Sequence, residues 1–166
     1  MIAMTDLELT AFSAVHLHYE IEMLAKLGRR ALSLRRQPVY GFDMNVLVES
    51  YAIHLRSLFD FLYKAPSGDD IAAAFYVNDV AAWEFARGSE PPVLVAARER
   101  VGKQIAHLTR RRFTDGAPEK NWHVETEMPA LTKTLKVFTA HAAPRRLHSQ
   151  VTILIDSLPD LWTGEE

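Results

Sequence analysis

Apolar residues recur along this chain with the spacing of a helix rather than that of a strand. The clearest run lies between Met44 and Leu62, where apolar positions mostly follow one another at intervals of three or four residues. Such spacing places them on one face of an amphipathic helix. Runs of β-branched residues with a period of two are missing, and no Asn-Gly or Asp-Gly turn joins two such runs. The pattern predicts an all-α fold, an up-and-down bundle of five or six helices.

Capping residues and prolines indicate where the helices begin and end. Thr5 and Glu8 form a T-x-x-E capping box, and Asp43 is a suitable N-cap. Pro92 follows a serine and an acid in the order typical of a helix start, and Pro144 suits the first turn of the last helix. These signals predict one domain, 1–166, with helices at 6–34, 44–64, 90–112, 125–142 and 144–157, irregular helical structure at 71–85 and a tail at 159–166.

The helix at 44–64 also carries apolar residues outside its main stripe. Val46, Ile53 and Phe61 form a second apolar patch on it. A helix that is apolar on more than one side is typical of a buried position. We therefore expect this helix at the centre of the bundle, covered on several sides.

Composition narrows the class of protein. The chain has 166 residues, of which 48% are hydrophobic and 24% charged, as in ordinary globular domains. It has no cysteine, which excludes disulfides, thiolate metal sites and cysteine nucleophiles. The N-terminus has acids and no basic stretch before an apolar run, and no apolar run approaches the roughly 20 residues of a membrane helix. We expect a soluble cytoplasmic protein with no cofactor and no membrane partner.

Basic residues concentrate in the segment 98–112, although the net charge of the chain is −2. Within it, Arg100 and His107 are seven residues apart, so a helix places them within about 20° of one line. Neighbouring cations favour the neutral imidazole, which can accept a proton from a hydroxyl group. A guanidinium can hold a phosphate and stabilise the charge that develops on it. This pair could therefore promote attack of an RNA 2′-hydroxyl on its own phosphate without a metal ion.

The same pair resembles a known motif. An arginine followed after four to six residues by a histidine marks the HEPN superfamily, and Arg100-x6-His107, with the stretch KQIAHLT around the histidine, is similar to it. Val101 follows Arg100, whereas active members often have Asn, Asp or His at that position. The resemblance implies an all-α, dimeric, metal-independent endoribonuclease of a toxin–antitoxin or phage-defence system. It also implies an antitoxin-like protein partner encoded nearby.

Each residue of the basic segment has an expected role in such an enzyme. His107 would act as general base or acid, and Arg100 would stabilise the phosphate. The residues expected to hold the RNA backbone are Lys103, Arg110, Arg111 and Arg112.

A narrow polar strip runs along the otherwise apolar helix at 44–64. Glu49, Arg56 and Asp60 lie on it at i, i+7 and i+11. Buried charges need partners, so the carboxylates are expected to pair with the basic residues of 90–112, such as Arg100, Lys103 or Arg111. This polar network would fix how two helices cross, or it would orient His107.

Three other interpretations remain open. The basic residues could simply form a solvated helix face, and His107 a packed histidine. A noncatalytic module for protein–protein interaction or dimerisation would use the same helices. A metal-binding bundle is the third, since His16 and Glu20 are four residues apart, although no H-x3-H or H-E-x-x-H motif is present.

Overall fold

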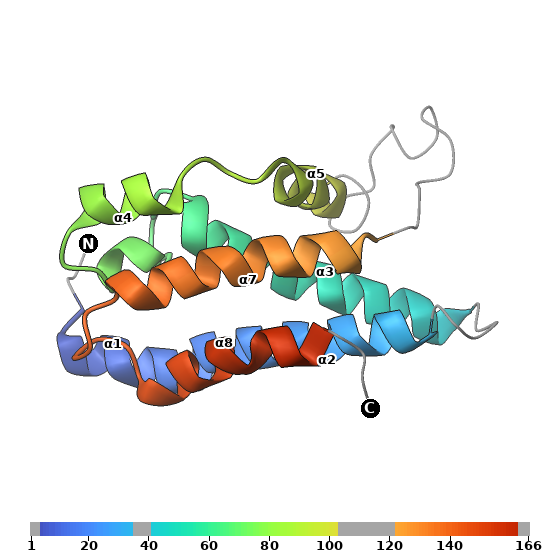
Figure 1. Cartoon of the computed structure of the whole chain (residues 1–166), viewed down its shortest axis with the longest axis horizontal. Coiled ribbons are helices and arrows are strands. Elements are labelled where there is room, and N and C mark those ends of the chain that lie inside the picture. The colour runs from blue at the N-terminus through green and yellow to red at the C-terminus, as the bar shows by residue number, and fades with distance from the viewer. Residues whose placement is uncertain (1–3, 35–40, 103–121, 163–166) are drawn as a thin grey trace.

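The computed structural model describes residues 4–34, 41–102 and 122–162, and the side chains as far as residue 158. Its regular elements within these ranges are helical, which confirms the predicted all-α bundle (Figure 1). The elements are α1 (Asp6–Phe12), a π-helical turn η1 (Ser13–Leu17), α2 (His18–Leu34), α3 (Phe42–Tyr63), a 3-10 turn η2 (Ala73–Phe75), α4 (Val80–Arg87), α5 (Pro92–Arg100), α7 (Val124–His141) and α8 (Ser149–Trp162).

The long helices form two antiparallel pairs. α2 is followed by the antiparallel α3, and α7 by the antiparallel α8 (Figure 1). α2 packs against both α3 and α8, while the short helices α4 and α5 lie across α7 on the side away from α8. In this arrangement the end of α5 lies close to the start of α7 (Figure 1). That junction is where the candidate site is found.

An aromatic cluster anchors one end of the core. Phe138 of α7 contacts the rings of Phe61, Tyr76 and Trp83 in edge-to-face geometry, with centroid distances between 5.3 and 5.9 Å. Phe138 is fully buried. Edge-to-face pairs contribute beyond the burial of apolar area, so this cluster ties α3, η2 and α4 to α7.

The first helix matches its prediction. Thr5 and Glu8 make both hydrogen bonds of the capping box, and α1, η1 and α2 continue one another over the predicted range 6–34. The predicted N-cap of the second helix was wrong. The N-cap of α3 is Gly41 and the helix begins at Phe42, so that Asp43 lies in its first turn. The acid still faces the positive end of the helix dipole there.

The last helix also differs from its prediction. Pro144 lies in a turn, and α8 begins only at Ser149 and continues past Pro159 to Trp162. The chain before it is held by contacts to other elements, because the Ala143 N–H donates to the Tyr76 carbonyl at 2.8 Å. The hydroxyl of Ser13 in turn accepts a hydrogen bond from the backbone N–H of His148 at 2.9 Å. These tertiary contacts override the proline signal.

The prediction of a central helix at 44–64 was wrong in its detail. Val46 and Ile53 of α3 are about half exposed, and only Phe61 of the second patch is buried. The central position belongs to α7, which packs against α2, α3, α4, α5 and α8. Periodicity shows that a helix has two apolar faces, but not which of them another helix covers.

The predictions for residues 71–85 and 90–112 agree with the structure as far as it describes them. The irregular stretch at 71–85 contains η2 and the beginning of α4, whose N-cap Asp79 accepts a hydrogen bond from the Ala82 N–H at 3.0 Å. The predicted helix at 90–112 is described only as far as residue 102, and α5 covers Pro92–Arg100 of it. Among the described helices, none combines the length and the apolar character that crossing a membrane requires.

Candidate functional site

The described residues contain only part of the predicted site. Arg100 is the last residue of α5. His107 lies outside the described residues, as do the predicted RNA-binding residues Lys103, Arg110, Arg111 and Arg112. Of the predicted catalytic and RNA-binding residues, Arg100 is the one that lies within the described ranges.

Arg100 lies against an aromatic ring. Its Cζ atom is 5.2 Å from the centroid of the Trp122 ring, a distance typical of a cation–π contact. The buried residues Leu94, Ala97 and Val101 fix α5 on the bundle, and the guanidinium extends from the adjacent position while the residue remains partly exposed. The contact restricts where the guanidinium lies.

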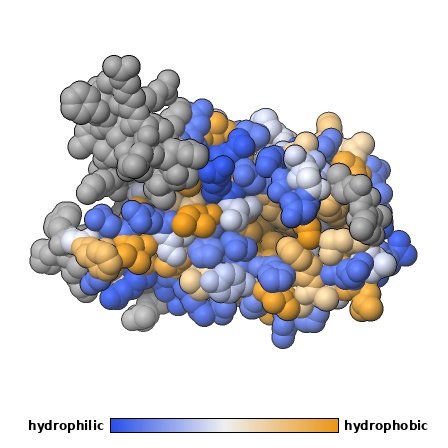
Figure 2. Space-filling model, turned by 180° about the vertical axis from the view of Figure 1, so that it is seen from behind, coloured by the Kyte–Doolittle hydropathy of each residue, from blue (hydrophilic) through white to orange (hydrophobic). Residues whose placement is uncertain are grey.

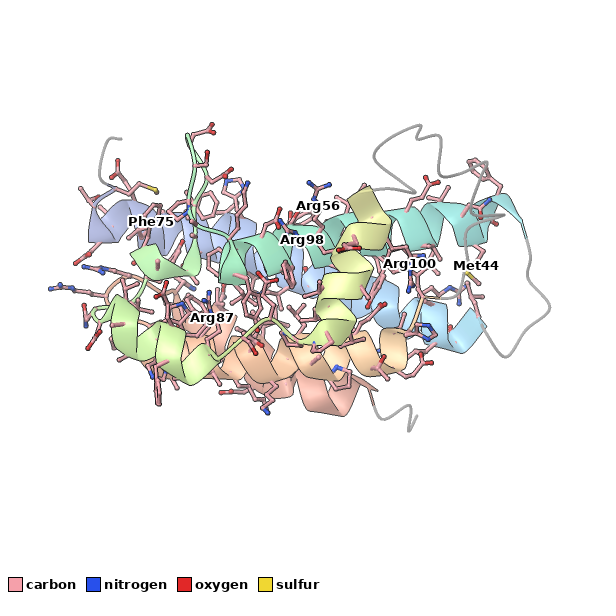
Figure 3. The ribbon with its side chains drawn as sticks, turned by 90° about the horizontal axis from the view of Figure 1, so that it is seen from above. Met44, Arg56, Phe75, Arg87, Arg98 and Arg100 are labelled. Carbon is pink, nitrogen blue, oxygen red and sulfur yellow. The ribbon has the colours of Figure 1, made fainter. Side chains whose placement is uncertain are left out.

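Arg98 and Arg100 extend in different directions from α5. In Figure 3, Arg98 lies beside Arg56 of α3, whereas Arg100 lies on the other side of α5, toward the end of α3 that carries Met44. Residues two apart on a helix do not share a face. The two arginines therefore serve different partners.

The partner of Trp122 on α3 is Tyr51. The two rings are in edge-to-face contact with their centroids 6.1 Å apart. The hydroxyl of Tyr51, which is a buried residue, donates to the Glu127 carboxylate at 3.1 Å. A line of contacts thus runs from Arg100 through Trp122 and Tyr51 to Glu127.

Glu127 is a buried carboxyl group in the first turns of α7. Only 1% of the residue is exposed. Its second oxygen accepts a hydrogen bond from the His123 backbone N–H at 3.3 Å. Burial raises the pKa of Glu127, while the hydrogen bonds from Tyr51 and His123 and the positive charge of Arg100 act to lower it. The carboxyl is thus fixed by two donors and attracted by the arginine.

The predicted polar strip on α3 divides in the structure. Asp60 lies between two arginines, 2.9 Å from Nε of Arg98 and 3.7 Å from Nε of Arg56. Its partner on α5 is Arg98, which the sequence did not single out for this pairing, and Arg98 also lies over the Phe59 ring. Glu49 is exposed to solvent. Arg56, Asp60 and Arg98 therefore form an ion-pair network that joins α3 to α5.

The histidines considered for a metal site have other partners. Nδ1 of His54 lies 2.8 Å from the carboxylate of Glu20, and His54 is buried between α2 and α3. His16 instead contacts the Phe12 ring. Among the residues that the structure describes, no three histidine or carboxylate side chains lie close enough together to hold a metal ion.

Sequence reasoning missed Trp122, Tyr51 and Glu127 as members of the site. One signal was present, because Glu127 stands on the apolar stripe of α7 between Val124 and Leu131. A carboxyl on a core-facing position needs a partner. The pairing itself was out of reach, since Tyr51 and Glu127 are separated by 76 positions in the sequence.

No protein-family model, curated protein or solved structure matches the chain.

Proposed function

We propose that this chain is a HEPN-like bacterial protein that cleaves RNA without a metal ion, as a toxin or defence component. In this proposal His107 is the general base or acid, and Arg100 stabilises the phosphate. Lys103, Arg110, Arg111 and Arg112 bind the RNA backbone. The proposal includes a homodimer and an antitoxin-like protein partner.

The placement of Arg100 is the observation that supports the proposal best. Its guanidinium lies on the Trp122 ring and the residue is partly exposed. A side chain already restrained by a ring loses less conformational freedom when it binds a phosphate. Guanidinium groups bind phosphate oxygens through two parallel N–H donors. Arg100 thus has the restraint that this role requires, and the residue as a whole is not fully buried.

The proposed reaction is attack of an RNA 2′-hydroxyl on the adjacent phosphate. His107 accepts the proton of an RNA 2′-hydroxyl, and the oxygen attacks the adjacent phosphorus. Negative charge develops on the nonbridging oxygens, where Arg100 stabilises it. The bond to the 5′-oxygen breaks, and that oxygen takes the proton from the imidazolium of His107, directly or through a water molecule, which returns the histidine to its neutral form. The products are a 2′,3′-cyclic phosphate and a free 5′-hydroxyl.

Cleavage of a mixed RNA pool in EDTA tests the assignment. Loss of a general acid or base typically costs between about 10² and 10⁴ in rate, so His107→Ala should be nearly inactive. Loss of a charge-stabilising donor costs about 10² to 10³, which is the expectation for Arg100→Ala. His16→Ala, at an exposed histidine of η1, should cleave at the wild-type rate. Equal cleavage by wild type and His107→Ala would show that the catalytic assignment is wrong.

A second candidate function is a noncatalytic module that dimerises through α3. Three large apolar side chains on this helix are exposed: Phe42 to 80%, Val46 to 48% and Ile53 to 54%. Exposed apolar patches of this kind often mark protein–protein contacts. Figure 2 shows that such apolar side chains also occur elsewhere on the rear face of the molecule, in patches separated by polar ones.

Light scattering distinguishes this candidate. If α3 is the dimer interface, a variant with serine at Phe42, Val46 and Ile53 should have half the mass of the wild type. Ile153→Ser is a matched control, because Ile153 is an exposed apolar residue of α8. Equal masses for the wild type and the triple variant would exclude the α3 interface.

A further inference from the structure

Glu127 of α7 has a buried carboxyl group that substrate cannot touch. It is 1% exposed, so it cannot contact an RNA phosphate or donate a proton to one. It is also close enough to Arg100 for the positive charge of the arginine to act on its pKa. A role for Glu127 in the site must therefore pass through other residues.

Each carboxyl oxygen of Glu127 accepts a hydrogen bond from a residue that packs against Trp122 or follows it in the chain. One oxygen accepts from the Tyr51 hydroxyl, whose ring meets the Trp122 ring edge to face. The other accepts from the backbone N–H of His123, the residue next to Trp122. The carboxyl thus fixes both the ring that Trp122 packs on and the backbone that carries Trp122.

We propose that Glu127 is the positioning residue of the candidate site, holding Arg100 in place for phosphate through Tyr51 and Trp122. The proposal rests on the proposed role of Arg100 in RNA cleavage. When Glu127 is ionised, its attraction to the Arg100 guanidinium adds to the effect of the packed rings. An ordinary helix cap would stabilise α7 whether or not Arg100 is present, whereas the proposed role of Glu127 depends on Arg100.

Glu127→Gln is the informative substitution. A glutamine has nearly the same shape but no charge, and it has only one acceptor oxygen for the two donors. With the amide oxygen toward the His123 N–H, the amide NH2 faces the Tyr51 hydroxyl, which must then change from donor to acceptor. Glu125→Gln is the matched control, because Glu125 is an exposed acid in the same first turn of α7. Both changes replace a carboxyl group by an amide in the first turn of α7.

The kinetic test measures cleavage in two backgrounds. Since a misplacement of about 1 Å can cost about a hundredfold in rate, Glu127→Gln should lower kcat in the wild-type background by at least about tenfold. In the Arg100→Ala background it should have almost no further effect, because the group that it positions is gone. A comparable loss in both backgrounds would overturn the proposal, since Glu127 would then act through something other than Arg100.

A structural test decides the proposal even if the protein does not cleave RNA. Protons above the face of an indole ring are shifted upfield in an NMR spectrum, so the Nε–H signal of Arg100 reports its contact with Trp122. The signal is assigned by its loss in Arg100→Lys. In Glu127→Gln it should move toward the position of an exposed arginine such as Arg29, and in Glu125→Gln it should stay. An unchanged signal in Glu127→Gln would overturn the proposal.

Tyr51→Phe is a second variant for the case in which Glu127→Gln does not fold. It keeps the ring that contacts Trp122 and removes only the hydroxyl that donates to Glu127. The Arg100 signal should shift in the same direction as in Glu127→Gln, by a smaller amount. A wild-type protein that does not cleave RNA would count against the proposed function, while the NMR shifts would still decide whether Glu127 positions Arg100.

Discussion

The guanidinium of Arg100 lies over the indole ring of Trp122, with Cζ 5.2 Å from the ring centroid. These two residues stand on either side of the segment 103–121, so their contact brings the end of α5 and the approach to α7 to one place. Trp122 in turn packs on Tyr51 of α3. Three helices thus determine where this arginine lies.

A double-mutant cycle measures the contact between Arg100 and Trp122. Arg100→Met keeps most of the aliphatic stem, and Trp122→Leu keeps an apolar residue at the buried position. A cation–π pair of this kind should show a coupling of about 0.5–2 kcal/mol in the free energy of unfolding, determined with urea. Effects that simply add would mean that the guanidinium gains nothing from the ring.

The raised pKa of Glu127 predicts a pH dependence of stability. Because burial raises the pKa above its usual value of 4.5, the folded state binds this proton more tightly than the unfolded state. The stabilisation is complete below the unfolded pKa and is lost as the pH rises through the folded pKa. Glu127→Gln does not titrate. As the pH rises from below 4.5, the free energy of unfolding of the wild type should therefore fall relative to that of the variant.

Glu8 supplies a control of opposite sign for this titration. Hydrogen bonds from Thr5 lower the pKa of Glu8, so its contribution to stability is present above the unfolded pKa and is lost as the pH falls through the folded pKa. The difference between wild type and Glu8→Gln should thus move the other way with pH. The same direction for both variants would contradict the assignment of the two shifts.

Two neighbouring arginines that share Asp6 should differ in their contribution to stability. Nε of Arg145 and Nε of Arg146 each lie 2.7 Å from the Asp6 carboxylate, but their side chains are 68% and 23% exposed, respectively. Arg146 also donates to the carbonyls of Phe75 and Val77. Arg145→Ala should cost less than about 1 kcal/mol, as for other surface ion pairs.

Arg146→Ala should cost more than Arg145→Ala, roughly 2–3 kcal/mol, because it leaves two partly buried carbonyls without this donor. Urea unfolding of the two variants measures the difference directly. Equal costs would show that the carbonyl contacts of Arg146 contribute little and that the link from α1 to η2 depends on other residues.

Local signals in the sequence predict much of the fold. The spacing of the apolar residues gives the helices, and the Thr5–Glu8 capping box gives the first start to the residue. The start of α8 is different, because residues 142–148 are held by Tyr76 and Ser13, which are distant in sequence. A proline suggests a helix start only where no such contact competes with it.

The candidate site is less predictable for the same reason. Arg100 is apparent from the motif with His107, and the position of Glu127 on an apolar stripe indicates a buried acid. Which residues these two meet depends on how α3, α5 and α7 pack. The pairing of Asp60 is an example. The sequence predicts a basic partner within 90–112, such as Arg100, Lys103 or Arg111, whereas Arg98 is the arginine that meets Asp60.

Cleavage of an RNA and of the same sequence made as DNA, by the wild-type protein in EDTA, tests the central claim most directly. The 2′-hydroxyl is the nucleophile in the proposed reaction, so the RNA should be cut and should carry 2′,3′-cyclic phosphate ends, while the DNA stays intact. Cleavage of both polymers, or of neither across a mixed RNA pool, would contradict the account. If neither polymer is cut, a noncatalytic module that dimerises through α3 becomes the better proposal for the function.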